Sequence, residues 1–369
     1  MNSPPSPKIE IEPSPTFVDF LATWLDGGEF DGEEWTDQIT ERLTSHRRVR
    51  LMARARLERM LTHDLAKRAL SRSTEMYSLL LGDLGNAARE VAKSFQFIAV
   101  LGAPRTGGSY LTGELYSALG WDPTMVPAGI AHDGFPEAAP FPVGGGVGRS
   151  SRDVANPWDR TLSTSAEYVA MLEIFFQDRI SKGRAIVPKK ITKAVYAGGF
   201  FRSLLGSDAE YIITIRHPVA SCISTYEKSG GLPGDGRFRA RGAIEQWIYR
   251  DVSLLRPDVD PGELTYFDAY LRYWENYYVL LAISCITTGQ RRVVLPYAPG
   301  LMEDFASDLR IRFGGDSTVV PKKFEATAGK ALARHPEWFE AAEASMDRVA
   351  KVWEMAGLSF PMRELAICM

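Results

Sequence analysis

A glycine-rich turn early in the chain has the residue types of an anion-binding loop. Residues 102–109 read GAPRTGGS, which is the spacing of a phosphate-binding loop, G-x-x-x-x-G-K-[ST], with Gly108 in place of the lysine. Glycines let backbone N–H groups close around a phosphate, and a following helix adds positive charge from its N-terminus. Because that lysine is replaced and Arg105 lies inside the turn, the loop favours a nucleotide whose 5′-phosphate carries the bond that breaks. The alternative is that these residues form an ordinary glycine turn between a strand and a helix and bind no ligand.

A second motif follows the apolar run YIITI. It reads RHPVASCIS and places Arg216 at the carboxyl end of a predicted strand, where open α/β sheets bind their ligands. Ser224 lies early in the next helix, where its hydroxyl can face the same crevice. A guanidinium fork matches the geometry of a phosphate, and a serine adds one more donor. Either residue alone is typical of a plain surface, but two such motifs at adjacent strand ends predict one nucleotide site.

The elements that must position these motifs alternate along the chain. The short apolar run FQFIAV is typical of a strand buried on both faces, and further strands are expected at RAIVPKKI, AEYIITI and RRVVLPY. Helical patterns separate them, which predicts an α/β fold with a three-layer parallel sheet, right-handed crossovers and a P-loop-like nucleotide site. Residues 121–163 are rich in glycine and proline, lack periodicity and are expected to form a long loop or lid.

The chain is expected to have three parts. Residues 1–16 are rich in proline and serine and predict a disordered tail. Residues 17–94 carry apolar side chains at spacings of three and four, which predicts a helical extension through which an oligomer could form. Residues 95–369 form the predicted α/β domain.

Composition narrows the classes of function. The chain has 369 residues, 45% of them hydrophobic, and a formal net charge of −3, which argues against a protein that coats nucleic acid. Cys222, Cys285 and Cys368 are far apart and histidines are few, so neither a disulfide framework nor a metal site is expected. The apolar run near Tyr277 is shorter than the about 20 residues that span a bilayer. We therefore expect a cytoplasmic protein without a membrane span or a nucleic-acid partner.

The two motifs together resemble those of sulfotransferases that use 3′-phosphoadenosine 5′-phosphosulfate (PAPS). GAPRTGGSYL is similar to the family's 5′-phosphosulfate loop in the PRSGTT form of bacterial and tyrosylprotein members, and RHPVASCIS is similar to its 3′-phosphate motif. The resemblance covers about residues 95–360. It implies sulfuryl transfer from PAPS by in-line displacement to a hydroxyl or amine of a small-molecule acceptor, leaving 3′-phosphoadenosine 5′-phosphate (PAP), without a metal. Aromatic residues in the long loop fit an aromatic or lipid-like acceptor.

The resemblance assigns roles residue by residue. The residues implied to bind the donor are Arg105, Thr106, Gly107, Gly108, Ser109, Tyr110, Arg216 and Ser224. Among them, Tyr110 takes the place of an aromatic residue that stacks on adenine, and Arg216 with Ser224 takes the 3′-phosphate that distinguishes PAPS from ATP. Arg105 and Lys190 are implied to neutralise the charge on the bridging oxygen as the bond breaks. Gly108 departs from the hydroxyl residue usual in the family, which removes one hydrogen bond to phosphate.

The general base is expected in the segment AGIAHDGFPEA. Family members use a histidine or a glutamate there, and His132 has the most suitable ordinary pKa, near 6.5. His132 therefore ranks first and Asp133 and Glu137 follow, while His217 beside Arg216 is expected to be structural. Two other functions remain open: a P-loop nucleotide kinase or NTPase, against which the missing lysine counts, and a non-catalytic nucleotide-binding relative.

Overall fold

The computed structural model describes residues 13–25, 57–58, 60–138, 157–314 and 334–367. These residues belong to two compact units. Unit 1 comprises Met1–Phe95 and Pro127–Ala185, and unit 2 comprises Gln96–Val126 and Ile186–Met369. Among the described residues, no helix combines the length and the apolar character needed to cross a bilayer.

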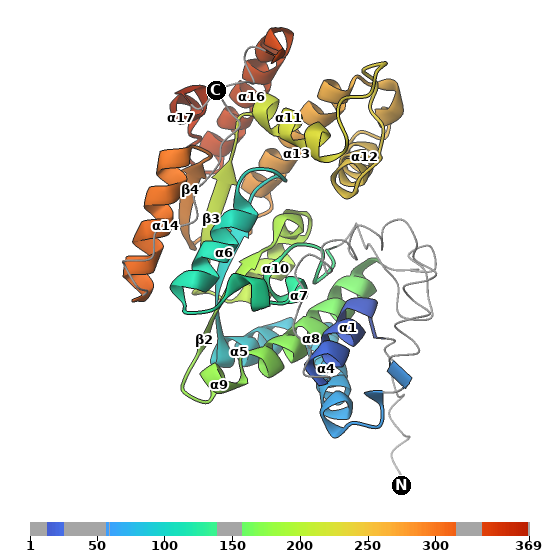
Figure 1. Cartoon of the computed structure of the whole chain (residues 1–369), viewed down its shortest axis with the longest axis vertical. Helices are drawn as coiled ribbons and strands as arrows, with labels where there is room; N and C mark the ends of the chain where they lie inside the picture. Colours follow the sequence, from blue (N-terminus) through green and yellow to red (C-terminus); the bar gives the residue numbers. More distant parts are fainter. Residues whose placement is uncertain (1–12, 26–56, 59, 139–156, 315–333, 368–369) are drawn as a thin grey trace. The chain divides into compact units, whose positions relative to one another are not determined.

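Unit 1 is helical. Its helices are α1 (Pro15–Leu25), α4 (Asp64–Gly82), α5 (Leu84–Ser94), α7 (Ala128–Ala131), α8 (Pro157–Phe175) and α9 (Gln177–Ile180). Helix α8 is the centre of the unit, because α1, α4 and α7 all pack against it. Figure 1 shows α4 and α8 side by side. Arg72 on α4 donates a hydrogen bond to the Glu173 carboxylate on α8 at 2.8 Å, which adds an ion pair to this apolar contact.

These units divide the chain differently from the predicted domains. Helix α8 was expected to belong to the α/β domain, but it shares a core with the N-terminal helices. Its side chains are buried around nearly the whole circumference, so it needs partners on more than one side. It also begins at Pro157, inside the predicted loop 121–163, of which residues 139–156 lie outside the described residues.

The predicted disordered tail, residues 1–16, overlaps the first helix at its carboxyl end. Helix α1 begins at Pro15, inside the segment 1–16, and Ser14 before it is buried. The apolar face that starts at Phe17 explains this start, because a helix that buries such a face also orders the turn that precedes it. Residues 1–12 lie outside the described residues.

A four-stranded parallel sheet confirms the predicted α/β class. The strands are β1 (Phe95–Leu101), β2 (Ala185–Lys190), β3 (Glu210–Ile215) and β4 (Arg291–Pro296), in the order β2-β1-β3-β4. They match the four apolar runs of the sequence. In the central pair, Ile98 lies opposite Glu210 and Leu101 lies opposite Ile213. The carboxyl ends of all four strands therefore lie at one edge of the sheet.

Helices flank this sheet in unit 2. They are α6 (Gly108–Ala118), α10 (Gly198–Leu205), α11 (Pro218–Lys228), α12 (Ala243–Leu255), α13 (Tyr266–Ile283), α14 (Pro299–Phe313), α16 (Phe339–Met355) and α17 (Met362–Ile367). Short 3₁₀ turns are η1 (Pro123–Met125), η3 (Thr192–Ala197), η4 (Pro261–Glu263) and η6 (Pro336–Trp338). Leu111 of α6 and Met302 of α14 share one apolar cluster with Val100 of β1. Arg310 and Glu114 join the same two helices by a buried ion pair of 2.7 Å.

Candidate functional site

The strand order creates a topological switch point between β1 and β3. From β1 the chain passes to β2 on one side, and β3 then pairs on the other side of β1. In open α/β sheets, ligands bind outside the carboxyl ends of the strands at such a point. Here β1 ends at Leu101, directly before the glycine turn, and β3 ends at Ile215, directly before Arg216. The structure thus places both sequence motifs at this crevice.

Two hydrogen bonds join the motifs directly. Arg216 Nη1 donates to the backbone oxygen of Arg105 at 3.2 Å, and Arg105 Nε donates to Ser224 Oγ at 3.0 Å. Ser224 lies on α11, the helix that follows β3. Three of the residues implied to bind the donor are therefore in contact, although about 110 residues separate the two motifs in the chain.

Arg216 is held in a buried position. Only 3% of the residue is exposed, and its guanidinium carbon lies 4.0 Å from the centre of the Tyr297 ring. Trp274 Nε1 donates to its backbone oxygen at 3.1 Å. Burial lowers the pKa of Arg216, because a desolvated charge is less stable than a hydrated one. An anion next to this guanidinium would offset that cost, which makes the site attractive to a phosphate.

The glycine turn has a closely packed interior. A Cβ atom on Gly102 would lie 2.1 Å from Thr214 Oγ1, so only glycine fits at this position. Thr106 Oγ1 donates to the backbone oxygen of Ala103 at 2.7 Å and also lies 2.8 Å from Thr214 Oγ1. The Thr106 hydroxyl thus holds the turn together, which leaves its backbone N–H as the group suited to a ligand.

Two tyrosines of α13 support the start of the turn, and neither was predicted from the sequence. The Gly102 N–H donates to the Tyr277 hydroxyl at 2.9 Å, and the Ala103 N–H donates to the Tyr278 hydroxyl at 3.4 Å. Tyr278 in turn donates to the Thr214 backbone oxygen at 2.8 Å, so one side chain links the β1 and β3 ends. In the sequence, both residues are part of an ordinary amphipathic helix, and no local signal distinguishes them.

Lys190 lies against the position where a P-loop would have its own lysine. A Cβ atom built on Gly108 would lie 3.2 Å from Lys190 Cε and 3.4 Å from its Cδ. The half-buried Lys190, at the end of β2, therefore lays its aliphatic stem over the first residue of α6. The glycine at position 108 therefore does more than remove a hydrogen-bonding side chain. Its lack of a side chain makes room for the lysine at the end of β2.

This packing predicts the effect of restoring a hydroxyl at position 108. In the sulfuryl transfer that the sequence resemblance implies, a Gly108→Ser variant is expected to be about tenfold slower, because the new Cβ displaces the Lys190 stem and misplaces its ammonium group. Gly113→Ser is the matched control on the same helix, since the nearest atom to its Cβ lies 3.9 Å away. Steady-state rates of both variants check the prediction, and undiminished turnover in Gly108→Ser would contradict it.

The remaining donor-site candidates, Gly107, Ser109 and Tyr110, differ in their surroundings. Gly107 has a φ of 90° and precedes α6, where a left-handed conformation favours glycine. Ser109 is exposed in the first turn of the helix. The Tyr110 ring packs against the core cluster of α6 and α14, and burial raises its pKa to about 12. Its role in stacking on adenine stays a prediction.

The three candidate bases all belong to unit 1. His132 and Asp133 are half-buried, directly after α7. Glu137 is buried and accepts a hydrogen bond from Arg160 at 3.3 Å, so its carboxylate is already used in an ion pair. His217 in unit 2 caps α11, since its Nδ1 accepts from the Val219 N–H at 3.3 Å, and burial lowers its pKa to about 4. Which of the three acts as the base stays a prediction.

Comparison of the chain with protein-family models, with curated proteins and with solved structures found no match. Function must therefore be inferred from the geometry and the chemistry of the residues themselves. Within the described ranges, no three histidine, cysteine or carboxylate side chains are grouped closely enough to hold a metal ion.

Proposed function

We propose that this protein is a sulfotransferase that uses PAPS as the donor and a small-molecule hydroxyl or amine as the acceptor. The observation that carries the proposal is the pair of hydrogen bonds joining Arg105, Arg216 and Ser224 at the switch point of the sheet. The sequence resemblance assigns these same residues to the two ends of the donor nucleotide.

The chemistry of the site fits an anionic nucleotide. Its polar groups are almost all hydrogen-bond donors: two guanidinium groups, the Lys190 ammonium, the Ser224 hydroxyl and the first N–H groups of α6. Arg216 and Ser224 would hold a 3′-phosphate. The turn from Arg105 to Ser109 would hold the 5′-phosphosulfate, with its backbone N–H groups directed at the equatorial oxygens.

The chain's own residues would then position the reactants and stabilise charge. When bound, PAPS supplies an activated sulfuryl group. Arg105 and Lys190 would stabilise the negative charge that develops on the leaving phosphate oxygen. As the sequence resemblance implies, His132, Asp133 or Glu137, in that order of preference, would accept the proton of the acceptor hydroxyl. An aromatic or lipid-like acceptor remains our expectation for this reaction.

Calorimetric titration tests the donor assignment. We expect PAP to bind with a dissociation constant on the order of micromolar and with no dependence on magnesium, whereas ADP should bind far more weakly. The second candidate function, a nucleotide kinase or NTPase, is favoured by the Lys190 stem beside Gly108, which brings a lysine near the P-loop position. Magnesium-dependent binding of ADP or ATP that exceeds PAP binding would support the kinase and overturn the sulfotransferase.

If the protein is instead a non-catalytic relative, a different result is expected. It would bind PAP as tightly but would not convert PAPS to PAP with any acceptor. Following PAP release from PAPS across a panel of phenols, aliphatic alcohols and amines therefore separates binding from transfer. We expect at least one class of acceptor to accelerate the release.

A further inference from the structure

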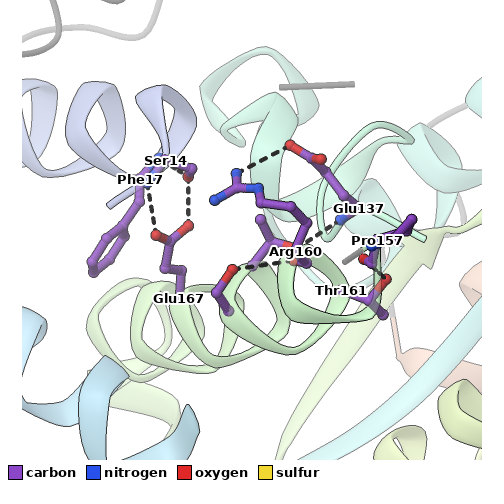
Figure 2. Close-up of polar contacts among 9 residues, drawn as sticks. Ser14, Phe17, Glu137, Pro157, Arg160, Thr161 and Glu167 are labelled. Carbon is purple, nitrogen blue, oxygen red and sulfur yellow. Dashed lines mark hydrogen bonds and ion pairs between the residues drawn. The ribbon is translucent and has the colours of Figure 1, made fainter. Parts of the chain in front are cut away.

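Ser14 links the start of α1 to a buried carboxylate of α8. The Ser14 N–H donates to Glu167 Oε1 at 2.7 Å, and the Ser14 hydroxyl donates to Glu167 Oε2 at 2.5 Å. The same hydroxyl oxygen accepts from the Phe17 N–H at 3.2 Å, so Ser14 also caps α1. Figure 2 shows Ser14 with both contacts to the Glu167 carboxylate. Neither residue is appreciably exposed, and 153 residues separate them in the chain.

Helix α1 is anchored by its apolar face as well. Phe17, Phe20 and Leu21 are all buried, and α1 packs against both α8 and α7. One aromatic contact extends this face: the Trp24 ring meets the Phe175 ring of α8 edge-on, with 6.0 Å between the ring centres. Helix α7 leads directly into His132, so α1 contacts the element that precedes the candidate bases.

Arg160 connects the Glu167 end of α8 to the same segment. It lies about two helical turns before Glu167, on the same side of the helix, and donates to Glu137 Oε1 at 3.3 Å. In Figure 2 its guanidinium lies between Glu137 and the Ser14–Glu167 pair. Burial lowers the pKa of Arg160, but the two carboxylates outweigh it and the net pKa is raised. Arg160 therefore stays charged and is shared by the two carboxylates.

Helix α8 also holds the candidate-base segment on both sides of His132. Before it, the Tyr168 hydroxyl donates to the Ile130 backbone oxygen at 3.2 Å. After it, the Phe135 ring meets the Tyr168 ring edge-on at 6.4 Å, and the Glu137 N–H donates to Thr164 Oγ1 at 2.9 Å. The position of His132 and Asp133 thus depends on how α8 presents its polar side chains.

From these contacts we infer that α1 is a positioning element for residues 128–138. Ser14 caps α1 and binds Glu167, which keeps α1 packed against α7, and α7 leads directly into His132. The catalytic meaning of this arrangement rests on the proposed function, but the physical coupling does not. Ser14 and Arg160 are positioning residues here, and neither is proposed to touch a substrate.

The loss of Ser14 would reach residues 128–138 through α1. Burial raises the pKa of Glu167 to about 7, although Arg160 and Ser14 both act to lower it. Without the Ser14 hydroxyl that pKa rises further, so Glu167 loses its charge more readily, and α1 loses its cap. The packing of α1 against α7 then weakens, and residues 128–138 lose one anchor.

Hydrogen–deuterium exchange of the full-length chain tests this coupling without any assay of activity. In Ser14→Ala, amide exchange within residues 128–138 is expected to rise about tenfold, while exchange in α6 and α13 stays at the wild-type rate. Ser14→Thr keeps the hydroxyl and should restore protection. Ser71→Ala is the matched control, because Ser71 makes an exposed contact to Glu75 on α4 of the same unit.

Two results would overturn the inference. One is faster exchange in α1 with residues 128–138 unchanged, and the other is an equal rise throughout the chain. A second measurement then links the coupling to the proposed reaction: in Ser14→Ala, PAP affinity should be unchanged while kcat falls about tenfold and its pH profile shifts. Failure of wild-type PAP binding would reject the sulfotransferase alone, because the exchange result stands independently.

Discussion

Replacing Arg216 with methionine is expected to weaken PAP binding about 100-fold or more without unfolding the protein. Truncating one partner of a buried, hydrogen-bonded charge pair typically costs about 2–5 kcal/mol of binding free energy. The apo protein should tolerate the change, because burial lowers the pKa of Arg216 and its charge is unfavourable there without an anion. Methionine keeps much of the volume beside Tyr297. The lost hydrogen bond to the Arg105 backbone oxygen should lower the free energy of unfolding by about 1 kcal/mol.

Calorimetry with PAP and a thermal melt of the apo protein measure the two halves of this prediction. Arg348→Met is the matched control, because Arg348 forms an exposed ion pair with Glu275. It should leave PAP affinity unchanged. Arg216→Lys keeps the positive charge but loses the planar guanidinium with its paired N–H donors, so this variant should bind PAP with intermediate affinity. Wild-type PAP affinity in Arg216→Met would remove the 3′-phosphate assignment.

The meeting of the two motifs was predictable from the sequence because it depends on topology. Both motifs follow buried strands, and parallel strands end at one edge of a sheet. Once the apolar runs are assigned as β1 and β3, the glycine turn and Arg216 must lie at the same edge. The contact between Arg105 and Ser224 then requires only that Ser224 lies early in the helix that follows.

Contacts that depend on side-chain packing were not predictable in this way. Lys190 fills the space beside Gly108, so a position that seemed to lack a hydrogen bond instead accommodates a lysine from another strand. Tyr277 and Tyr278 bind the backbone of the turn from a distant helix. No local sequence pattern predicts such contacts. The spacing of apolar residues along a helix indicates which face is buried, but it does not indicate which backbone groups the tyrosine hydroxyls will contact.

The place of the N-terminal helices was missed for a related reason. Periodicity correctly predicted helices in the described parts of residues 17–94, but it could not show that α8 would join them. The polar contact between Ser14 and Glu167 spans 153 residues, and a single serine before a proline carries no signal of its partner. The extension therefore looked like an appendage in the sequence, whereas in the structure its helices α1 and α4 pack against α8.

Removing the Arg105 guanidinium is expected to reduce sulfuryl transfer about 100-fold or more, which is the usual effect of deleting one donor that stabilises transition-state charge. Arg105 has a φ of 71°, a conformation that is strained for any residue except glycine. Alanine keeps the Cβ atom and therefore the same backbone strain, so Arg105→Ala removes the guanidinium alone. Arg105→Gly also relieves the strain, because glycine adopts this φ freely, so the pair of variants separates the side chain from the backbone.

We expect Arg105→Gly and Arg105→Ala to lose turnover to a similar degree, measured as PAP formed from PAPS with a saturating acceptor. Arg105→Lys, which retains a charge, should keep more of the rate than either. Ser224→Ala frees Arg105 Nε from its hydrogen bond and should mainly weaken PAP binding. Transfer at the wild-type rate in Arg105→Gly would show that position 105 shapes the turn and takes no part in stabilising the leaving group.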